Sequence, residues 1–184
     1  MWRHRDRLGH LICAGLLLVN LTVATVSLTG AGGPVMAPGA APVLPLREFR
    51  VVTVAGEVYT QETLKGQPAL LMFWAPRCSV CQRELPILRD FYQTRKPPQL
   101  RVLTIGFADS RQNVDEYVNA HPDTFPFPTA YDERNRVATT FGVNATPAFV
   151  AVDAQGRIVL THRGGGINQN PRYQAFLSSL AKSR

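Results

Sequence analysis

Two cysteines, Cys78 and Cys81, stand two residues apart between an apolar run, Ala69–Phe73, and a segment with helical periodicity. A C-x-x-C pair where a buried strand meets a helix is typical of a redox site. In the first turn of a helix, unpaired N–H groups and the helix dipole favour the thiolate, which is the attacking species. Arg77 adds a positive charge beside Cys78. We therefore expect Cys78 to be the nucleophile and Cys81, on the same helix face, to close a disulfide with it.

Two other uses of a cysteine pair fit the sequence less well. A zinc site needs two further ligands, but the only other cysteine is Cys13 and the four histidines show no ligand spacing. A structural disulfide that closes so small a loop removes little entropy from the unfolded chain. The sequence therefore predicts redox chemistry, with neither a metal nor another cofactor.

The residues around the cysteines resemble a known family. The run 73–86, FWAPRCSVCQRELP, is similar to the active-site segment of the membrane-anchored TlpA/ResA/DsbE-like thioredoxin-fold proteins of bacteria, typically F-W-A-x-W-C-x-x-C-x-x-E-x-P. Residues 142–149, GVNATPAF, resemble the cis-proline segment of these proteins, and the resemblance covers about residues 45 to 182. The x-V-C ending of the motif is similar to that of the ScsD-like branch. Arg77 departs from the pattern, because tryptophan is usual at its position.

The resemblance implies where a client protein would bind. Pro147 is expected to follow a cis peptide bond opposite the cysteines, where the backbone of Thr146 would pair with the client as an added strand. From the sequence alone, a trans proline that ends a loop is the alternative. We also predict that Trp74 and Arg77, which precede Cys78 in the motif, contribute to client binding.

Glu84 is the third predicted catalytic residue, after Cys78 and Cys81. The resemblance to ResA-like proteins implies that its carboxyl group takes or gives the proton of Cys81. Met72 occupies the position where thioredoxins proper carry a buried aspartate, so Glu84 is the candidate replacement. The alternative is an ordinary solvated charge on a helix, the common state of glutamate.

Strands and helices alternate along the rest of the chain, which predicts an α/β fold. Strands are expected at 47–54, 58–60, 69–74, 101–107, 148–152 and 157–161, and helices after Cys81, at 110–120, at 132–141 and after Pro171. The resemblance implies a thioredoxin-like fold, a central mixed sheet flanked by helices, with the TlpA-type insertion of a strand and a helix between the two motifs. Residues 46–184 are predicted to form this one domain.

The segment before this domain predicts export. Arg3, Arg5 and Arg7 precede an uncharged, largely apolar run, residues 11–28, which is near the length of a membrane span. Residues 1–29 are therefore predicted to be a signal anchor, an N-terminal apolar helix, or else a cleaved signal peptide. Residues 30–45, rich in Gly, Ala and Pro, are predicted to be a tether. The arginines predict a cytoplasmic N-terminus, which would place the domain in the periplasm on a single-pass anchor in the bacterial inner membrane, or free there after cleavage.

The predicted activity is that of an enzyme, a thiol–disulfide oxidoreductase that uses Cys78 and Cys81 as a reductant of client proteins outside the cytoplasm. Its partners would be disulfide-containing clients and a thiol or electron donor in the membrane. The net charge of +7 comes from dispersed residues without aromatic interleaving, so no nucleic-acid partner is predicted. Two alternatives stay open. One is a thiol peroxidase of the peroxiredoxin kind, although Ala75 stands where such enzymes are expected to have threonine. The other is a copper-binding chaperone, although the C-x-x-x-C spacing expected of such a protein is absent.

Overall fold

The centre of the sheet is built from the apolar runs of the sequence. The structure, a computed structural model, describes residues 44–182. Strands β4 (Ala69–Trp74) and β7 (Ala148–Val152) bury every residue, as expected of strands that are covered on both faces. β4 pairs in parallel with β5 (Arg101–Gly106) and antiparallel with β7, so the sheet is mixed, as predicted.

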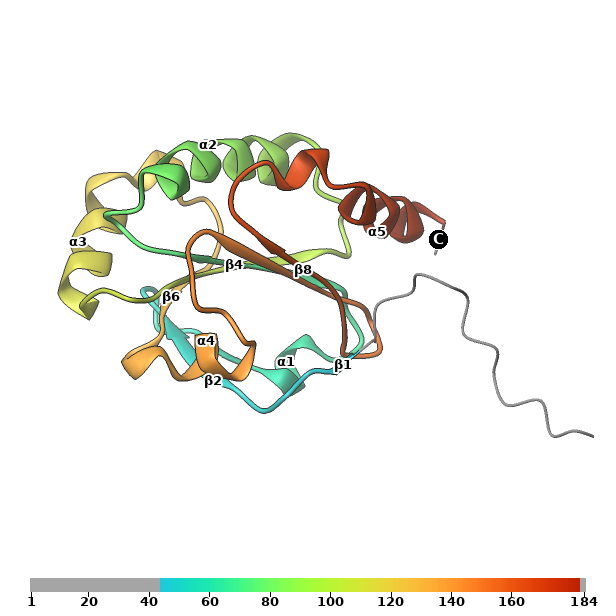
Figure 1. Ribbon diagram of the computed structural model, residues 1–184, viewed down its shortest axis with the longest axis horizontal. Helices are drawn as coiled ribbons and strands as arrows, with labels where there is room; N and C mark the ends of the chain where they lie inside the picture. The colour runs from blue at the N-terminus through green and yellow to red at the C-terminus, as the bar shows by residue number, and fades with distance from the viewer. Residues whose placement is uncertain (1–43, 183–184) are drawn as a thin grey trace, which may run out of the picture. The chain divides into compact units, whose positions relative to one another are not determined.

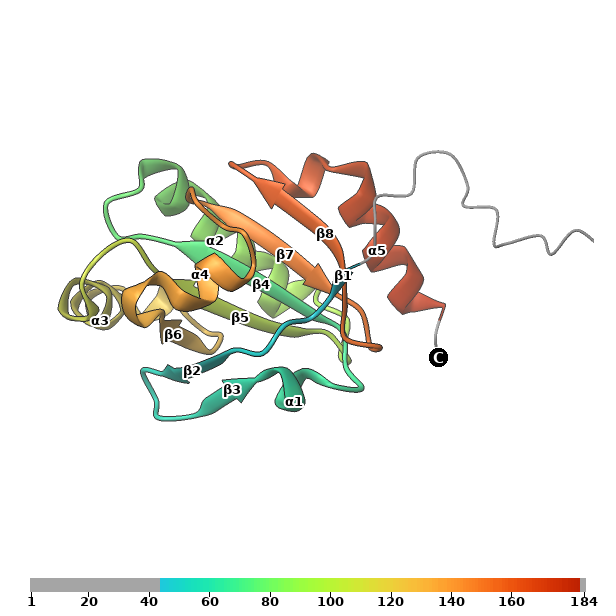
Figure 2. The ribbon, with the colours of Figure 1, turned by 60° about the horizontal axis from the view of Figure 1, so that its bottom comes forward.

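Eight strands form one sheet in the order β1-β8-β7-β4-β5-β6-β2-β3 (Figure 2). The outer strands are β1 (Leu44–Pro45), β8 (Arg157–Arg163), β6 (Thr129–Tyr131), β2 (Arg50–Thr53) and β3 (Val58–Thr60). β6 lies parallel to β5 and is the extra strand expected between the two motifs. β1 pairs with β8, so the last two residues of the predicted tether belong to the sheet. The strand predicted at 47–54 is confined to β2.

Helices cover both faces of the sheet (Figure 1). One face carries α2 (Ser79–Thr94), α3 (Arg111–Ala120) and α5 (Pro171–Ala181), and the other carries α1 (Gln61–Leu64) and α4 (Arg136–Thr140). Each layer has its own apolar core, with Trp74 and Cys81 in the first and Phe73 and Phe141 in the second. The residues of β4 therefore alternate between the two cores, and its last residue faces the layer that contains the cysteine helix.

The helix predicted at 132–141 is divided. A short 3-10 turn, Glu133–Asn135, precedes α4, because Arg134 and Asn135 adopt left-handed φ values of 58° and 56°. The buried carboxylate of Asp132 spans the break by accepting hydrogen bonds from the backbone N–H groups of Val137 and Ala138, at 2.9 and 2.7 Å. Burial raises the pKa of Asp132 above its ordinary value, against the opposing effect of these donors.

The predictions for residues 1–29 and for 30–43 lie outside the described residues. Within 44–182, no helix has both the length and the apolar character needed to cross a membrane.

Candidate active site

The two cysteines lie where β4 passes into α2. Cys78 is the N-cap residue of α2, one position before the first turn, and its sulfur accepts a hydrogen bond from the Cys81 N–H at 3.1 Å. The two sulfurs are joined in a disulfide, with 5.1 Å between the Cα atoms. Cys78 is half-buried whereas Cys81 is fully buried. An incoming disulfide can therefore reach the sulfur of Cys78 more readily than that of Cys81.

Glu84 lies one turn beyond Cys81 on α2 and is not a solvated helix charge. Its side chain is only 8% exposed. Its Oε1 atom accepts a hydrogen bond of 2.8 Å from the backbone N–H of Gly166, which is 82 residues away in the sequence. A buried carboxyl group one helical turn from a buried thiol is a candidate to exchange a proton with it.

The proline segment reaches the same edge of the sheet. The Thr146–Pro147 peptide bond is cis, as the resemblance implied. Phe73 of β4 pairs with Ala148 of β7, so Pro147 stands beside the end of β4, from which the chain continues to Cys78. In the described part of the chain, no hydrogen bond involves the backbone of Thr146, which is half-buried. This backbone can therefore pair with an added strand.

Trp74 does not fit its predicted role in client binding. Its side chain has an exposure of 0%. Its ring packs against those of Phe125 and Tyr117, with centroid distances of 5.0 and 5.5 Å. The burial argues against this role: both faces of β4 are covered, so Trp74 is a core residue, in the layer that contains α3.

Arg77 is exposed beside Cys78. Its charge is the smallest of the influences on the pKa of Asp109, in the loop after β5. Hydrogen bonds from the Asn113 side chain and the Ser110 N–H, together with the charge of Arg77, hold the pKa of Asp109 below its ordinary value. The positive charge beside the nucleophile is thus partly balanced by a carboxylate.

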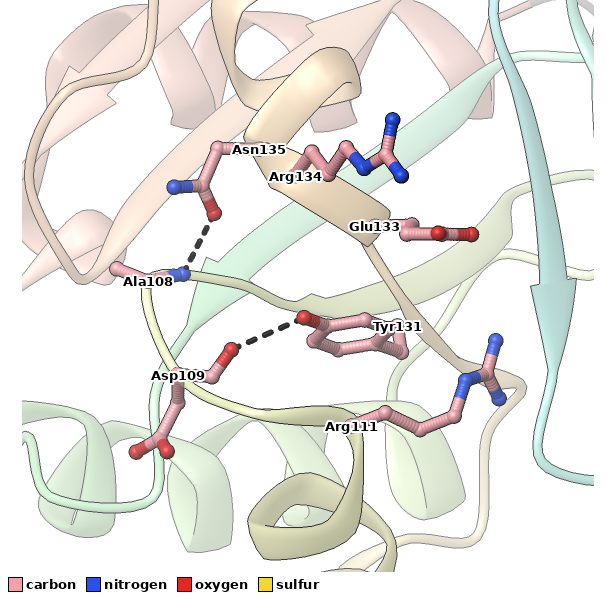
Figure 3. Close-up of a pocket in the computed structure, with 7 residues that line it drawn as sticks. All are labelled: Ala108, Asp109, Arg111, Tyr131, Glu133, Arg134 and Asn135. Carbon is pink, nitrogen blue, oxygen red and sulfur yellow. Dashed lines mark hydrogen bonds between the residues drawn. The ribbon is translucent and has the colours of Figure 1, made fainter.

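The loop after β5 also borders an open pocket of about 900 Å³ (Figure 3). The N–H of Ala108 donates to Asn135 Oδ1 at 2.9 Å, and the Tyr131 hydroxyl donates to the backbone oxygen of Asp109 at 3.0 Å. These bonds tie the loop to the end of β6 and to the segment after it. They fix the backbone at Asp109.

Replacing Arg77 with alanine should slow the alkylation of reduced Cys78 by iodoacetamide, because less thiolate is stabilised. We expect a modest, roughly two- to fivefold effect at low salt, since the guanidinium is exposed. Asp109→Asn removes the negative charge and keeps the acceptor oxygen, so it should speed the alkylation of Cys78. Both effects should shrink in high salt. A rate that is unchanged in Arg77→Ala, or a change that salt does not screen, would contradict this role.

The prediction from sequence missed the loop that follows β8. The three glycines 164–166 carry no chemical group of their own, yet Gly166 donates to Glu84 and the N–H of Gly164 donates to the backbone oxygen of Pro147 at 2.8 Å. The one signal in the sequence was three consecutive glycines directly after a strand that pairs with the proline strand. Among residues 44–182, no cluster of three or more His, Cys, Asp or Glu side chains is placed to hold a metal ion.

Comparisons with known proteins agree with this geometry. A family model described as the AhpC/TSA family matches residues 43–161. The thiol-disulfide oxidoreductase ResA of Bacillus thuringiensis (strain Al Hakam) is 26% identical over 111 residues, which span 60% of this chain and 63% of the relative's length, less than two thirds of it.

Solved structures agree as well. The dsbF protein of Mycobacterium tuberculosis (MTB) superposes with a TM-score of 0.61 at 29% identity, over 72% of this chain and 94% of that one. The thioredoxin domain of a thiol-disulfide oxidoreductase from Bacteroides vulgatus superposes with a TM-score of 0.62 at 17% identity, over 76% of this chain and 98% of that one. The fold is thioredoxin-like, as predicted.

Proposed function

The chain belongs to the AhpC/TSA family, and from its paired cysteines at the start of α2 we propose that it is a thiol–disulfide oxidoreductase acting on protein disulfides. The observation that carries this proposal is the difference in exposure between the two cysteines. One sulfur is half-exposed at a helix N-terminus, and the other is buried one turn later. The names of the similar proteins, thiol-disulfide oxidoreductases, support the same activity.

The reaction is proposed to proceed in two exchanges. The Cys78 thiolate attacks one sulfur of the client disulfide, forms a mixed disulfide and releases the other client sulfur as a thiolate. Cys81 then loses its proton and attacks the sulfur of Cys78, which releases the second client thiolate. The client gains two electrons, and the protein is left with the Cys78–Cys81 disulfide. We propose the reducing direction; the reverse sequence would oxidise a client.

Glu84 and the proline segment are proposed to assist these steps. The Cys81 thiol is buried, so its deprotonation needs a nearby base, and the buried carboxylate of Glu84 lies one helical turn away. The client is proposed to pair with the backbone of Thr146 next to Pro147, which makes no hydrogen bond within residues 44–182. Arg77, exposed beside the nucleophile, would contact the client and favour acidic segments.

The setting is proposed from the sequence of the N-terminal segment. Residues 1–29 would anchor the chain in a bacterial inner membrane, with the domain of residues 46–184 in the periplasm, or would be removed as a signal peptide. Once oxidised, Cys78 and Cys81 need a thiol or electron donor, which we propose to be a membrane protein. A test is the mapping of the chain's N-terminus and membrane association in cells.

The activity is tested with the full chain and a protein disulfide. In the presence of dithiothreitol, catalytic amounts of the full chain should accelerate the reduction of insulin, measured by the turbidity of its released B chain. No acceleration would contradict the proposal. Peroxide consumption and a Cu(I) titration of the same reduced preparation then test the thiol peroxidase and the copper-binding chaperone as alternatives.

A further inference from the structure

The three glycines after β8 lie against the helix that carries the cysteines. A Cβ atom on Gly165 would stand 2.6 Å from Glu84 Oε1 and 3.1 Å from a methyl group of Val80, and both of these residues are on α2. The φ angle of Gly165 lies outside the left-handed region, so its backbone would accept alanine. Glycine is therefore needed here for close approach: the loop passes so near the Glu84 carboxylate that it leaves no room for a methyl group.

The glycine loop is bonded on two sides. The Gly166 N–H donates to Glu84 Oε1 at 2.8 Å, and the Gly164 N–H donates to the carbonyl oxygen of Pro147 at 2.8 Å. One short segment thus connects the buried carboxylate of α2 with the proline segment that is proposed to receive the client.

His162 holds the loop through the carbonyl group of Gly165. Its Nε2 atom lies 3.0 Å from that oxygen, and its Nδ1 atom lies 3.1 Å from Asn170 Nδ2. A carbonyl oxygen only accepts and an amide nitrogen only donates, so Nε2 carries the proton and Nδ1 accepts. The Asn170 amide is fixed in this orientation, because its oxygen accepts from the Arg172 N–H at the start of α5. Both ring nitrogens of His162 are therefore used to hold the loop.

We propose that Gly165 and His162 are positioning residues for the second exchange step. They fix the loop, and the loop fixes the Glu84 carboxylate through the Gly166 N–H, one turn from Cys81. This inference rests on the proposed function, in which Glu84 accepts the proton of Cys81. It predicts that changes in the loop slow the attack of Cys81 and leave the attack of Cys78 unchanged, because Cys78 already stands at the helix N-terminus.

The two steps can be followed separately with Ellman's reagent on the reduced full chain carrying Cys13→Ser, in which Cys78 and Cys81 are the only thiols. Attack by Cys78 releases one thionitrobenzoate, and attack by Cys81 on the resulting mixed disulfide releases a second. In Gly165→Ala the added methyl group should displace the carboxylate rather than the backbone, since Oε1 is the end of a flexible side chain. We expect the second release to slow on the order of tenfold, part of the loss that removal of a general base causes, and its pH profile to move towards higher pH.

His162 gives an independent variant. His162→Leu removes both hydrogen bonds and should slow the second release as Gly165→Ala does. His162→Gln supplies one donor and one acceptor and should restore much of the rate. Loss of the first release to the same extent in both His162→Leu and Gly165→Ala would mean that the loop has only a structural role and would overturn the proposal.

A double-variant cycle separates the loop from the carboxylate. In a Glu84→Ala background, where no carboxylate is left to displace, Gly165→Ala should add no further loss. An equal loss in both backgrounds would overturn the proposal. If Glu84→Ala alone leaves the second release intact, the proposed role of Glu84 and this inference both fall, although dithiol chemistry stands. If the Cys13→Ser chain with no other change releases no second thionitrobenzoate, the oxidoreductase function itself falls.

Discussion

Replacing Cys81 with serine is expected to leave the protein covalently attached to its clients. The Cys78 thiolate can still attack a client disulfide, but no thiol remains one turn along α2 to attack the sulfur of Cys78. A mixed disulfide of chain and client should therefore accumulate, visible on a non-reducing gel and reversed by dithiothreitol. Turnover should fall by roughly a thousandfold or more, as when an enzyme loses a residue of its nucleophilic machinery.

Cys78→Ser is the matched control for the accumulation of this mixed disulfide. It should show the same loss of turnover with no trapped client, since Cys81 has an exposure of 0% and cannot be reached by a protein disulfide. If Cys78→Ser trapped clients and Cys81→Ser did not, the roles of the two cysteines would be the reverse of those proposed.

Replacing Trp74 with alanine is expected to cause the largest loss of stability near the site. The indole ring is fully buried between β4 and α3 and contacts Phe125 and Tyr117. Removal of a buried Trp or Phe ring costs roughly 3–5 kcal/mol of unfolding free energy. Urea unfolding of the full chain, followed by circular dichroism, measures this loss.

Two further variants make the test of Trp74 specific. Trp74→Phe keeps an aromatic ring, and it breaks no hydrogen bond, because Nε1 has no partner within residues 44–182; its cost should be clearly smaller. Ile87→Ala on α2, where the side chain is 40% exposed, should cost under about 1 kcal/mol. A Trp74→Ala chain that unfolded at the wild-type urea concentration but no longer bound clients would restore the client-binding role that its burial argues against.

The features that the sequence predicted well are local. The strand β4, the cysteine pair at the start of α2 and the helix α3, predicted at 110–120, each depend on residues within one or two turns of each other. Such features follow from periodicity, capping preferences and helix electrostatics. The cis bond before Pro147 was also predicted, but only through the resemblance, since the local sequence by itself favours a trans proline that ends a loop.

The features that the sequence did not predict depend on contacts between distant segments. The bond from Gly166 to Glu84 joins residues 82 positions apart, and nothing in the local sequence indicates which carboxylate the glycines approach. Trp74 was predicted to bind the client because it belongs to the motif, but both faces of β4 are covered, so its side chain lies in the core. The helix predicted at 132–141 is divided at Arg134 and Asn135, whose left-handed φ angles helical periodicity does not indicate.

The reduction potential of the Cys78–Cys81 couple tests the proposed thiol–disulfide exchange most directly. The full chain would be equilibrated against glutathione or dithiothreitol buffers, and the fraction of disulfide measured by alkylation and mass. For a reductant we predict one reversible two-electron couple near that of thioredoxin, roughly −270 mV. A value near that of DsbA, roughly −120 mV, would reverse the proposed direction of electron flow. The absence of any reversible two-electron couple would contradict thiol–disulfide exchange itself.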